Sequence, residues 1–215
     1  MPLHPLWSDD YWPLIMQLYL SKPTGVKSLY SKPVVDLAIR LHLPPKFLYA
    51  QMHQLREHAT PYMQRLWDTY VGNARRLNRD VRRLNDMSGF GAASLFYDGV
   101  DTDDDFAADY RPIAPGSKFT AVMLTIILDL YFRLTPITMV KETPEVADCA
   151  RMLGISADDV VQALCTYQSC DPILHRAAPA DSALTAACRK VWKRFSSEEP
   201  DRLAAEAVRL AEYFK

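Results

Sequence analysis

Glycine is scarce in this sequence: only 7 of its 215 residues are glycine, and four of them lie between positions 89 and 116. Sheet proteins need glycine at many of their tight turns, so this scarcity disfavours a β-rich fold. Almost half of the residues are apolar and 24% are charged, which suits an ordinary globular core rather than a disordered chain. The composition therefore predicts an all-α protein.

Long apolar segments are also lacking, and no secretion signal is evident. The longest apolar run, residues 121–134, is interrupted by Asp129 and Arg133 and is shorter than the roughly 20 residues that cross a bilayer. The N-terminus has no basic segment followed by an apolar one, as a signal peptide would have. All four cysteines lie in the second half, and Cys149 falls on the apolar side of a helical pattern. We therefore expect free thiols and a cytoplasmic protein without a membrane-spanning segment.

Charge is unevenly distributed, although the net charge is only −1. Residues 1–86 carry 12 basic and 7 acidic side chains, residues 87–116 carry one basic and six acidic, and residues 117–215 carry 12 basic and 13 acidic. The middle segment also holds most of the glycine, a composition typical of a linker or long surface loop. We therefore expect a helical unit at 1–86, an acidic linker at 87–116 and a second helical unit at 117–215, packed separately or as one globular domain.

The two flanking segments resemble each other at a constant offset of 112 residues. Residues 14–52 align without gaps on residues 126–164, and the matches fall at helical spacings, where core residues belong. An internal duplication of a multi-helix unit explains this pattern, and a chance alignment of two amphipathic segments is the alternative. Seven of the aligned pairs are identical: Ile15/Ile127, Leu18/Leu130, Tyr19/Tyr131, Val34/Val146, Asp36/Asp148, Ala38/Ala150 and Leu41/Leu153.

Capping signals and apolar spacing predict several individual helices. Ser156 followed by Asp158 and Asp159 is typical of a helix start, because the serine caps the helix and the acids favour its dipole. Apolar residues at three- and four-residue steps predict one long helix over residues 60–86. The last two helices are expected over residues 182–195 and 200–213.

Residues 146–164 resemble the helix-turn-helix motif of bacterial DNA-binding proteins. The small residue Ala150 stands where the two helices of that motif approach each other, Gly154 stands at the turn, and Ser156 caps the second helix. The resemblance implies a helix-turn-helix-like corner in the second unit.

The first unit resembles the same motif less closely, over residues 34–52. It keeps the small residue Ala38 but departs from the pattern at the turn, where His42 replaces the glycine and Pro44 and Pro45 follow. By this resemblance, each unit contains one such corner.

In helix-turn-helix proteins the second helix enters the major groove of DNA, and its first residues contact the base edges. An uncompensated Asp158 beside Asp159 on that helix would repel the phosphates, so we predict that the second unit reads DNA poorly. None of the residues that the resemblance places on this face of the second unit is basic: Ala157, Asp158, Val161, Gln162 and Cys165. The equivalent face of the first unit is only slightly more favourable: Lys46, Tyr49, Ala50 and His53.

A cluster of arginines lies within the helix predicted over residues 60–86. It could contact DNA phosphates or the acidic side chains of a partner protein, and a smaller basic cluster lies at 190–194. The alternative is a solvated helix face, partly neutralised by Asp80 and Asp86 or covered by the acidic segment 98–109. Together with Lys46 and His53 of the first unit, the candidate contact residues are Arg75, Arg76, Arg79, Arg82 and Arg83.

The sequence contains no recognisable catalytic or metal-binding motif. Residues 53–58 lack the His-x-x-Glu-His spacing of zinc proteases. Cys165, Cys170 and His175 lack the tight Cys-x-x-Cys spacing of zinc sites. The run Asp101–Asp105 lacks the glycine and the closing glutamate of a calcium-binding EF-hand. We therefore expect no metal and no cofactor, and rank an enzyme third among the functional alternatives.

These observations favour an adaptor or regulatory protein that works through protein contacts. The first half has more large aromatic rings than one small unit needs, so some of them are candidates for an interface with a protein partner or in a homo-oligomer. These rings are Trp7, Tyr11, Trp12, Tyr19, Tyr30, Phe47 and Tyr49. The alternative function is a DNA-binding transcriptional regulator of the helix-turn-helix type that uses the arginine cluster and the first unit.

Overall fold

The computed structural model describes residues 4–87, 90, 105–174, 176, 182–195 and 200–215. Every regular element among these residues is a helix, and the one β-type contact there is an isolated bridge between Pro112 and Thr120. The prediction of an all-α protein is therefore confirmed. The chain divides into two compact units, Met1–Asp104 and Asp105–Lys215.

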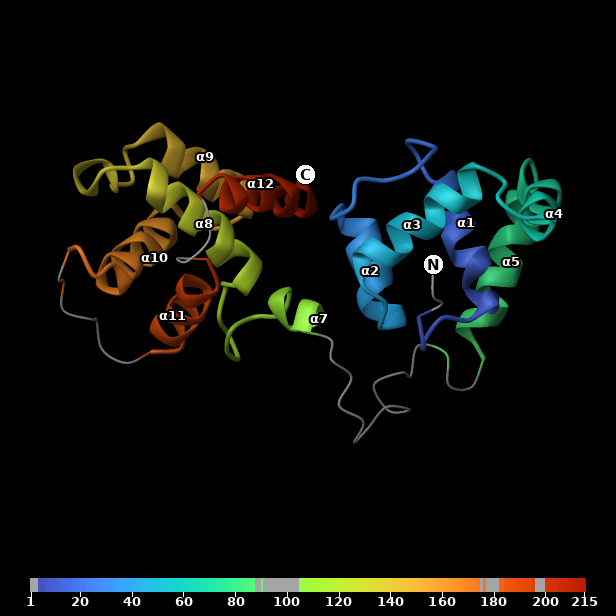
Figure 1. The fold of residues 1–215 in the computed structure, drawn as a ribbon, viewed down its shortest axis with the longest axis horizontal. Helices are drawn as coiled ribbons and strands as arrows, with labels where there is room; N and C mark the ends of the chain where they lie inside the picture. Colours follow the sequence, from blue (N-terminus) through green and yellow to red (C-terminus); the bar gives the residue numbers. More distant parts are fainter. Residues whose placement is uncertain (1–3, 88–89, 91–104, 175, 177–181, 196–199) are drawn as a thin grey trace. The chain divides into compact units, whose positions relative to one another are not determined.

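The first unit is built around its first α-helix. Its elements are η1 (Asp9–Tyr11), α1 (Trp12–Leu20), α2 (Lys32–Leu41), α3 (Pro45–Arg56), α4 (Pro61–Tyr70) and α5 (Ala74–Asn85) (Figure 1). Helix α1 packs against α3, α4 and α5, and α2 packs against α3. These contacts bury Ile15, Met16, Leu48, Met52 and Leu55 completely, so the core of this unit lies between α1 and α3.

Helices α4 and α5 replace the single long helix predicted over residues 60–86. Gly72, between the two helices, has a φ of +80°, a left-handed conformation that interrupts the helix. Asn73 then caps α5, because its side chain accepts a hydrogen bond of 3.1 Å from the amide of Arg76. The prediction of one long helix is wrong, since the apolar spacing continues across this turn and hides it.

The second unit is built around helix α8. Its elements are α7 (Asp105–Asp109), α8 (Ala121–Arg133), η2 (Pro136–Thr138), α9 (Pro144–Leu153), α10 (Ala157–Cys170), α11 (Ala183–Phe195), α12 (Pro200–Ala211) and η3 (Glu212–Phe214). Helix α8 contacts each of the other α-helices of the unit, and α10 also packs against α9 and α11. The hydroxyl of the fully buried Tyr167 donates a hydrogen bond of 2.9 Å to the carbonyl of Leu124, which ties α10 to α8.

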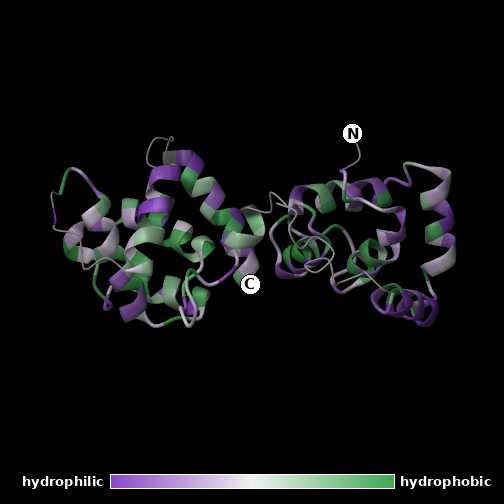
Figure 2. Ribbon diagram, turned by 90° about the horizontal axis from the view of Figure 1, so that it is seen from below, coloured by the Kyte–Doolittle hydropathy of each residue, from purple (hydrophilic) through white to green (hydrophobic). Residues whose placement is uncertain are grey.

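The start of the second unit lies inside the acidic segment 87–116. Helix α7 packs against α8, so residues 105–116 belong to the second unit rather than to a connection between units. Residues 91–104, which hold most of the acidic run, lie outside the described residues. Along the helices of both units, apolar residues recur among polar ones, as expected for helices with one buried face (Figure 2).

The C-cap residues of α2 and α9 adopt the left-handed conformation. His42 follows α2 with a φ of +53°, and Gly154 follows α9 with a φ of +69°. This conformation closes a helix with a backbone hydrogen bond to the preceding turn. In the first case the amide of Leu43 donates to the carbonyl of Ala38 over 3.0 Å.

No helix in the described part of the chain is both long and apolar enough to cross a membrane.

Candidate functional site

The candidate arginines lie on one face of α5. At about 100° per residue, Arg75, Arg76, Arg79, Arg82 and Arg83 fall within an arc of about 120°. All five are exposed, whereas Leu77, Val81 and Leu84 are buried on the opposite side of the helix. The folded protein therefore presents one continuous basic surface, which we call the arginine face.

The arginine face is only partly neutralised within its own unit. Asp80 lies at its edge and accepts ion pairs from Arg79 at 3.2 Å and from Arg76 at 3.9 Å. The hydroxyl of Tyr70 also donates to Asp80 over 3.2 Å, and burial together with this carboxylate raises the pKa of Tyr70. Arg75, Arg82 and Arg83 form no ion pair with any described residue. Among the described residues, nothing neutralises these three side chains.

Helix α5, which carries the arginine face, is held in place by contacts with neighbouring helices. Its buried residues pack against α1 and α4. The side-chain amide of Gln17 on α1 also donates a hydrogen bond of 3.0 Å to the side-chain oxygen of Asn78 on α5. A second hydrogen bond joins Arg40 of α2 to Asn85 near the end of α5. Asn73, Arg75, Arg76 and Arg79 line a surface hollow of about 430 Å³ near the start of the helix.

Lys46 and His53, the two other candidate contact residues, lie on α3. Lys46 is exposed, but His53 is half-buried against Tyr49, with ring centroids 4.6 Å apart. The Nε2 atom of His53 is fully buried and has no hydrogen-bond partner among the described residues. No hydrogen bond or ion pair between described residues joins either side chain to the arginine face, so the structure does not bring the predicted set together as one site.

The aromatic rings of the first half pack largely against one another. Trp7 lies with its ring centroid 5.2 Å from that of Trp12 and 5.4 Å from that of Phe47. Tyr19 contacts Trp67 edge-on at 5.4 Å, and both Trp12 and Tyr19 are buried. Trp12 and Tyr19 therefore belong to the core of the first unit, whereas the other five rings are half-buried: Trp7, Tyr11, Tyr30, Phe47 and Tyr49. The use of these half-buried rings in an interface stays a prediction.

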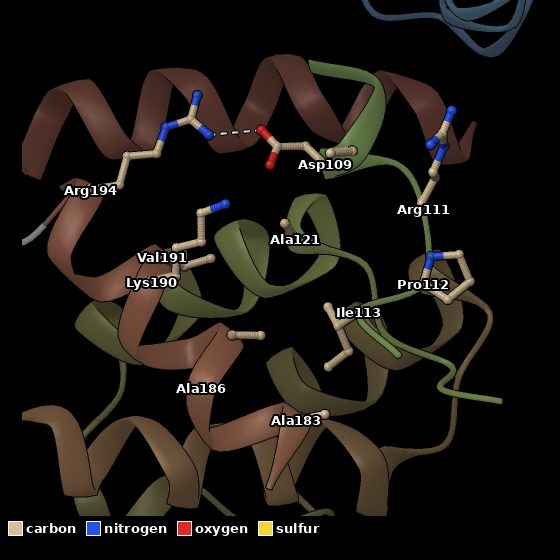
Figure 3. A pocket seen from close by; sticks show the side chains of 12 residues that line it. Asp109, Arg111, Pro112, Ile113, Ala121, Ala183, Ala186, Lys190, Val191 and Arg194 are labelled. Carbon is tan, nitrogen blue, oxygen red and sulfur yellow. Dashed lines mark hydrogen bonds and ion pairs between the residues drawn. The ribbon is translucent and has the colours of Figure 1, made fainter. Parts of the chain in front are cut away.

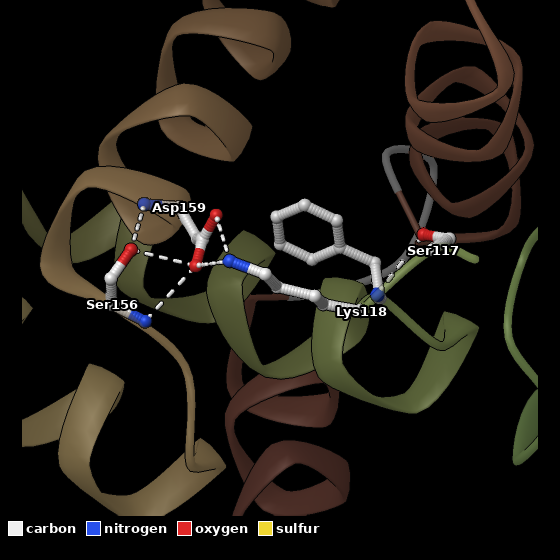
Figure 4. A network of polar contacts seen from close by, with 5 residues as sticks. Ser117, Lys118, Ser156 and Asp159 are labelled. Atoms are coloured by element: carbon white, nitrogen blue, oxygen red, sulfur yellow. Dashed lines mark hydrogen bonds and ion pairs between the residues drawn. The ribbon is translucent and has the colours of Figure 1, made fainter.

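The acidic start of α10 is partly compensated, because one of its two carboxylates has a close lysine partner. The carboxylate of Asp159 accepts hydrogen bonds from the amide of Ser156 at 3.0 Å and from Lys118 at 3.0 Å, and the hydroxyl of Ser156 accepts from the amide of Asp159 (Figure 4). The hydrogen bonds of Ser156 and the Lys118 ammonium hold the pKa of this carboxyl below its usual value. Lys141 lies 4.0 Å from the exposed carboxylate of Asp158. The prediction of uncompensated acids is therefore wrong for Asp159, which Lys118 faces from a distant part of the sequence. Asp158 remains 80% exposed, and its carboxylate would still face an approaching phosphate.

The face of α10 that would read DNA is bordered by the rest of its unit. Gln162 and Cys165 are exposed, but they line a hollow of about 330 Å³ together with Arg176 and residues of the segment 182–185. Ala157 and Val161, earlier on the same face, are half-buried. Gln162 and Cys165 therefore face a hollow of their own unit rather than standing on an isolated helix surface.

A second hollow in this unit was not predicted from the sequence. It has a volume of about 580 Å³ and lies between α11, the start of α8 and the segment that follows α7 (Figure 3). The only local signal for it is the row Ala183, Ala186, Ala187, Lys190 and Arg194, which recurs at three- and four-residue steps on one face of α11.

Among the described residues, no group of three or more His, Cys, Asp or Glu side chains could hold a metal ion. Cys165 is exposed and Cys170 half-buried, and His175, the third member of that sequence cluster, lies outside the described residues.

Comparisons with protein-family models, with curated proteins and with solved structures find no match to this chain. Function is therefore inferred from the arginine face, the start of α10 and the hollow beside α11.

Proposed function

We propose that this chain is a non-enzymatic adaptor or regulatory protein that binds an acidic surface of a partner protein through the arginine face of α5. The observation that carries the proposal is the grouping of five exposed arginines opposite the buried side of one helix, three of them without an ion pair among the described residues. Such a face attracts carboxylates and orients the encounter with a partner.

Arginine suits this role better than lysine. Its planar guanidinium presents donors in a fork that matches a carboxylate, so a partner's aspartates and glutamates can be held in a defined geometry. Capping by Asn73 and the contacts of α5 with α1 and α4 keep the helix in place, which lowers the entropy lost on binding.

We further propose that the two units descend from one helix-turn-helix-like unit. His42 and Gly154 occupy positions 112 residues apart and share the left-handed conformation. The carbonyls of Ala38 and Ala150, also 112 residues apart, accept equivalent hydrogen bonds of 3.0 Å and 3.1 Å from the residue that follows each turn. Both alanines are buried, as a close helix crossing requires. These paired features support a duplication over a chance alignment.

The alternative function is a DNA-binding regulator. The helix pairs α2–α3 and α9–α10 support it, together with the basic character of the first unit. Three observations weigh against it: the exposed Asp158 on α10, the partly enclosed surface around Gln162 and Cys165, and the buried Nε2 of His53 on α3. Binding to acidic protein surfaces does not require either of these helices.

The two functions are separated by titrating the full chain with a glutamate-rich peptide and with duplex DNA. The variant Arg75→Ala/Arg82→Ala removes two unpaired charges of the arginine face. The control variant Arg56→Ala/Arg65→Ala removes two exposed arginines of the same unit that lie on α3 and α4. Two exposed charge contacts are worth together about 1–2 kcal/mol, so the first variant should lose about tenfold in peptide affinity and the control less than about threefold.

Equal losses of peptide affinity in both variants would mean that binding depends only on the net charge of the protein. That result would overturn the arginine face as a site. Sub-micromolar, sequence-selective binding to duplex DNA would instead favour the regulator. In that case the logarithm of the affinity should fall with the logarithm of the salt concentration, and the Arg75→Ala/Arg82→Ala variant should flatten this slope by about 2.

A further inference from the structure

The hollow beside α11 has a preformed wall. The segment after α7 folds back on itself, because the amide of Ile113 donates a hydrogen bond of 2.9 Å to the carbonyl of Phe119 and Pro112 bridges to Thr120. Phe119 is buried beneath this turn, and α7 packs against α8. The wall that carries Arg111, Pro112 and Ile113 is therefore tied to the body of the second unit, as expected for a pocket that exists before its ligand arrives (Figure 3).

Small side chains account for the empty space. Residues from three separate segments line the hollow, and five of them are alanines: Ala108, Ala121, Ala183, Ala186 and Ala187. Val191, Pro112 and Ile113 complete the apolar part of the lining. A larger side chain at any of the alanine positions would occupy part of this volume. We call the hollow the alanine pocket.

Cations outnumber carboxylates around the alanine pocket. Arg194 of α11 and Asp109 of α7 neutralise each other through an ion pair of 2.7 Å. Arg111 and Lys190 also line the pocket, both are exposed, and neither forms an ion pair with a described residue. In Figure 3 Lys190 lies on α11 and Arg111 on the opposite wall, with Ala121 of α8 between them. An apolar ligand with a negatively charged end therefore complements the pocket better than a neutral one.

We propose that the alanine pocket binds a small amphipathic monocarboxylate of the medium-chain fatty acid class. Its hydrocarbon chain lies against the alanines, and its carboxylate accepts a hydrogen bond from Lys190, while Arg111 adds a second positive charge to the lining. The volume of about 580 Å³ lies within the range of small-molecule sites, and a mainly apolar lining with a few charged groups is their usual character. The site belongs to the second unit and does not depend on the function assigned to the arginine face of the first.

Decanoate is a suitable probe, and its binding to the full chain is measured by isothermal titration calorimetry. Saturable binding with one site is expected. Lys190→Ala should weaken it by about tenfold, because a charge-assisted hydrogen bond to the carboxylate is lost. Lys193→Ala removes the same charge from an exposed position of α11 outside the pocket, and should leave the affinity unchanged. Decanol, which has the same chain without the charge, should bind at least about tenfold more weakly than decanoate.

A second variant tests the cavity itself. Ala186 is exposed on α11, so Ala186→Phe can fill the pocket without disturbing the core, and decanoate binding should disappear. Ala205→Phe places the same ring on an exposed position of α12 outside the pocket and serves as the control. The circular dichroism spectrum and melting temperature of both variants should match the parent protein. Absence of saturable binding to the parent protein, or binding that survives both Lys190→Ala and Ala186→Phe, would overturn the proposal.

Discussion

Asp159 forms a polar network with Ser156 and Lys118 at the start of α10 (Figure 4). Replacing Asp159 by asparagine tests how much this network stabilises the second unit. The substitution keeps the shape of the side chain and removes its charge. It breaks an ion pair whose lysine is 65% exposed, worth about 0.2–1 kcal/mol. It also removes a negative charge from the first turn of a helix, worth about 0.3–1 kcal/mol. We therefore expect Asp159→Asn to lower the free energy of unfolding by about 1 kcal/mol at neutral pH.

This destabilisation should depend on pH, because the pKa of the Asp159 carboxyl is held below its usual value of 3.8 by the hydrogen bonds of Ser156 and by Lys118. A carboxyl with a lower pKa in the folded state stabilises the fold at pH values above its unfolded pKa. That contribution is lost as the pH falls from about 4 through the lower pKa of the folded state. The difference between parent and variant should therefore be largest at neutral pH and shrink in acid.

Urea unfolding followed by circular dichroism measures this difference at each pH. If the two units unfold separately, only the transition of the second unit should move. Asp148→Asn is the control, because it removes the 2.9 Å pair with Arg151 from two mostly exposed side chains in the middle of α9. Its effect should stay below about 0.5 kcal/mol. Equal stability of parent and Asp159→Asn at neutral pH, or a difference that does not decrease in acid, would refute the stabilising role of the network.

Two further predictions concern the left-handed residues and the cysteines. Gly154→Ala should lower the free energy of unfolding by about 1 kcal/mol in urea titrations, since an added Cβ would meet no atom within 4 Å and the cost is conformational. His42→Gly should act in the opposite direction by up to about 1 kcal/mol, because a positive φ costs histidine more than glycine, and a loss of stability there would contradict this conformational cost. A thiol reagent at neutral pH should modify the exposed Cys165 in the folded protein. Cys149 and Cys188 should react only on unfolding, because burial raises their thiol pKa values to about 11 and about 12, and reaction of either in the folded protein would contradict their burial.

The helical character of the chain could be predicted because it depends on local properties. Glycine scarcity, apolar spacing and the capping signal at Ser156 each act within a few residues, and the structure confirms the all-α class and the start of α10. The division of α5 into a buried and an exposed side is also local, because it follows from the helical period of its apolar residues. The break at Gly72 was missed for a related reason: the apolar spacing is the same on both sides of the turn, and it does not reveal that the backbone there adopts a positive φ.

What the sequence by itself determined is the helix class, several helix ends and the face of α5 on which the arginines gather. Only the tertiary structure decided which charges meet: Lys118 reaches Asp159 across 41 residues, and Arg194 reaches Asp109 across 85. The alanine pocket is also a product of packing, because its lining comes from three segments whose separation in sequence says nothing of their distance in space. Helical periodicity determines which side of a helix a residue occupies, whereas its neighbours across the core depend on how whole helices pack.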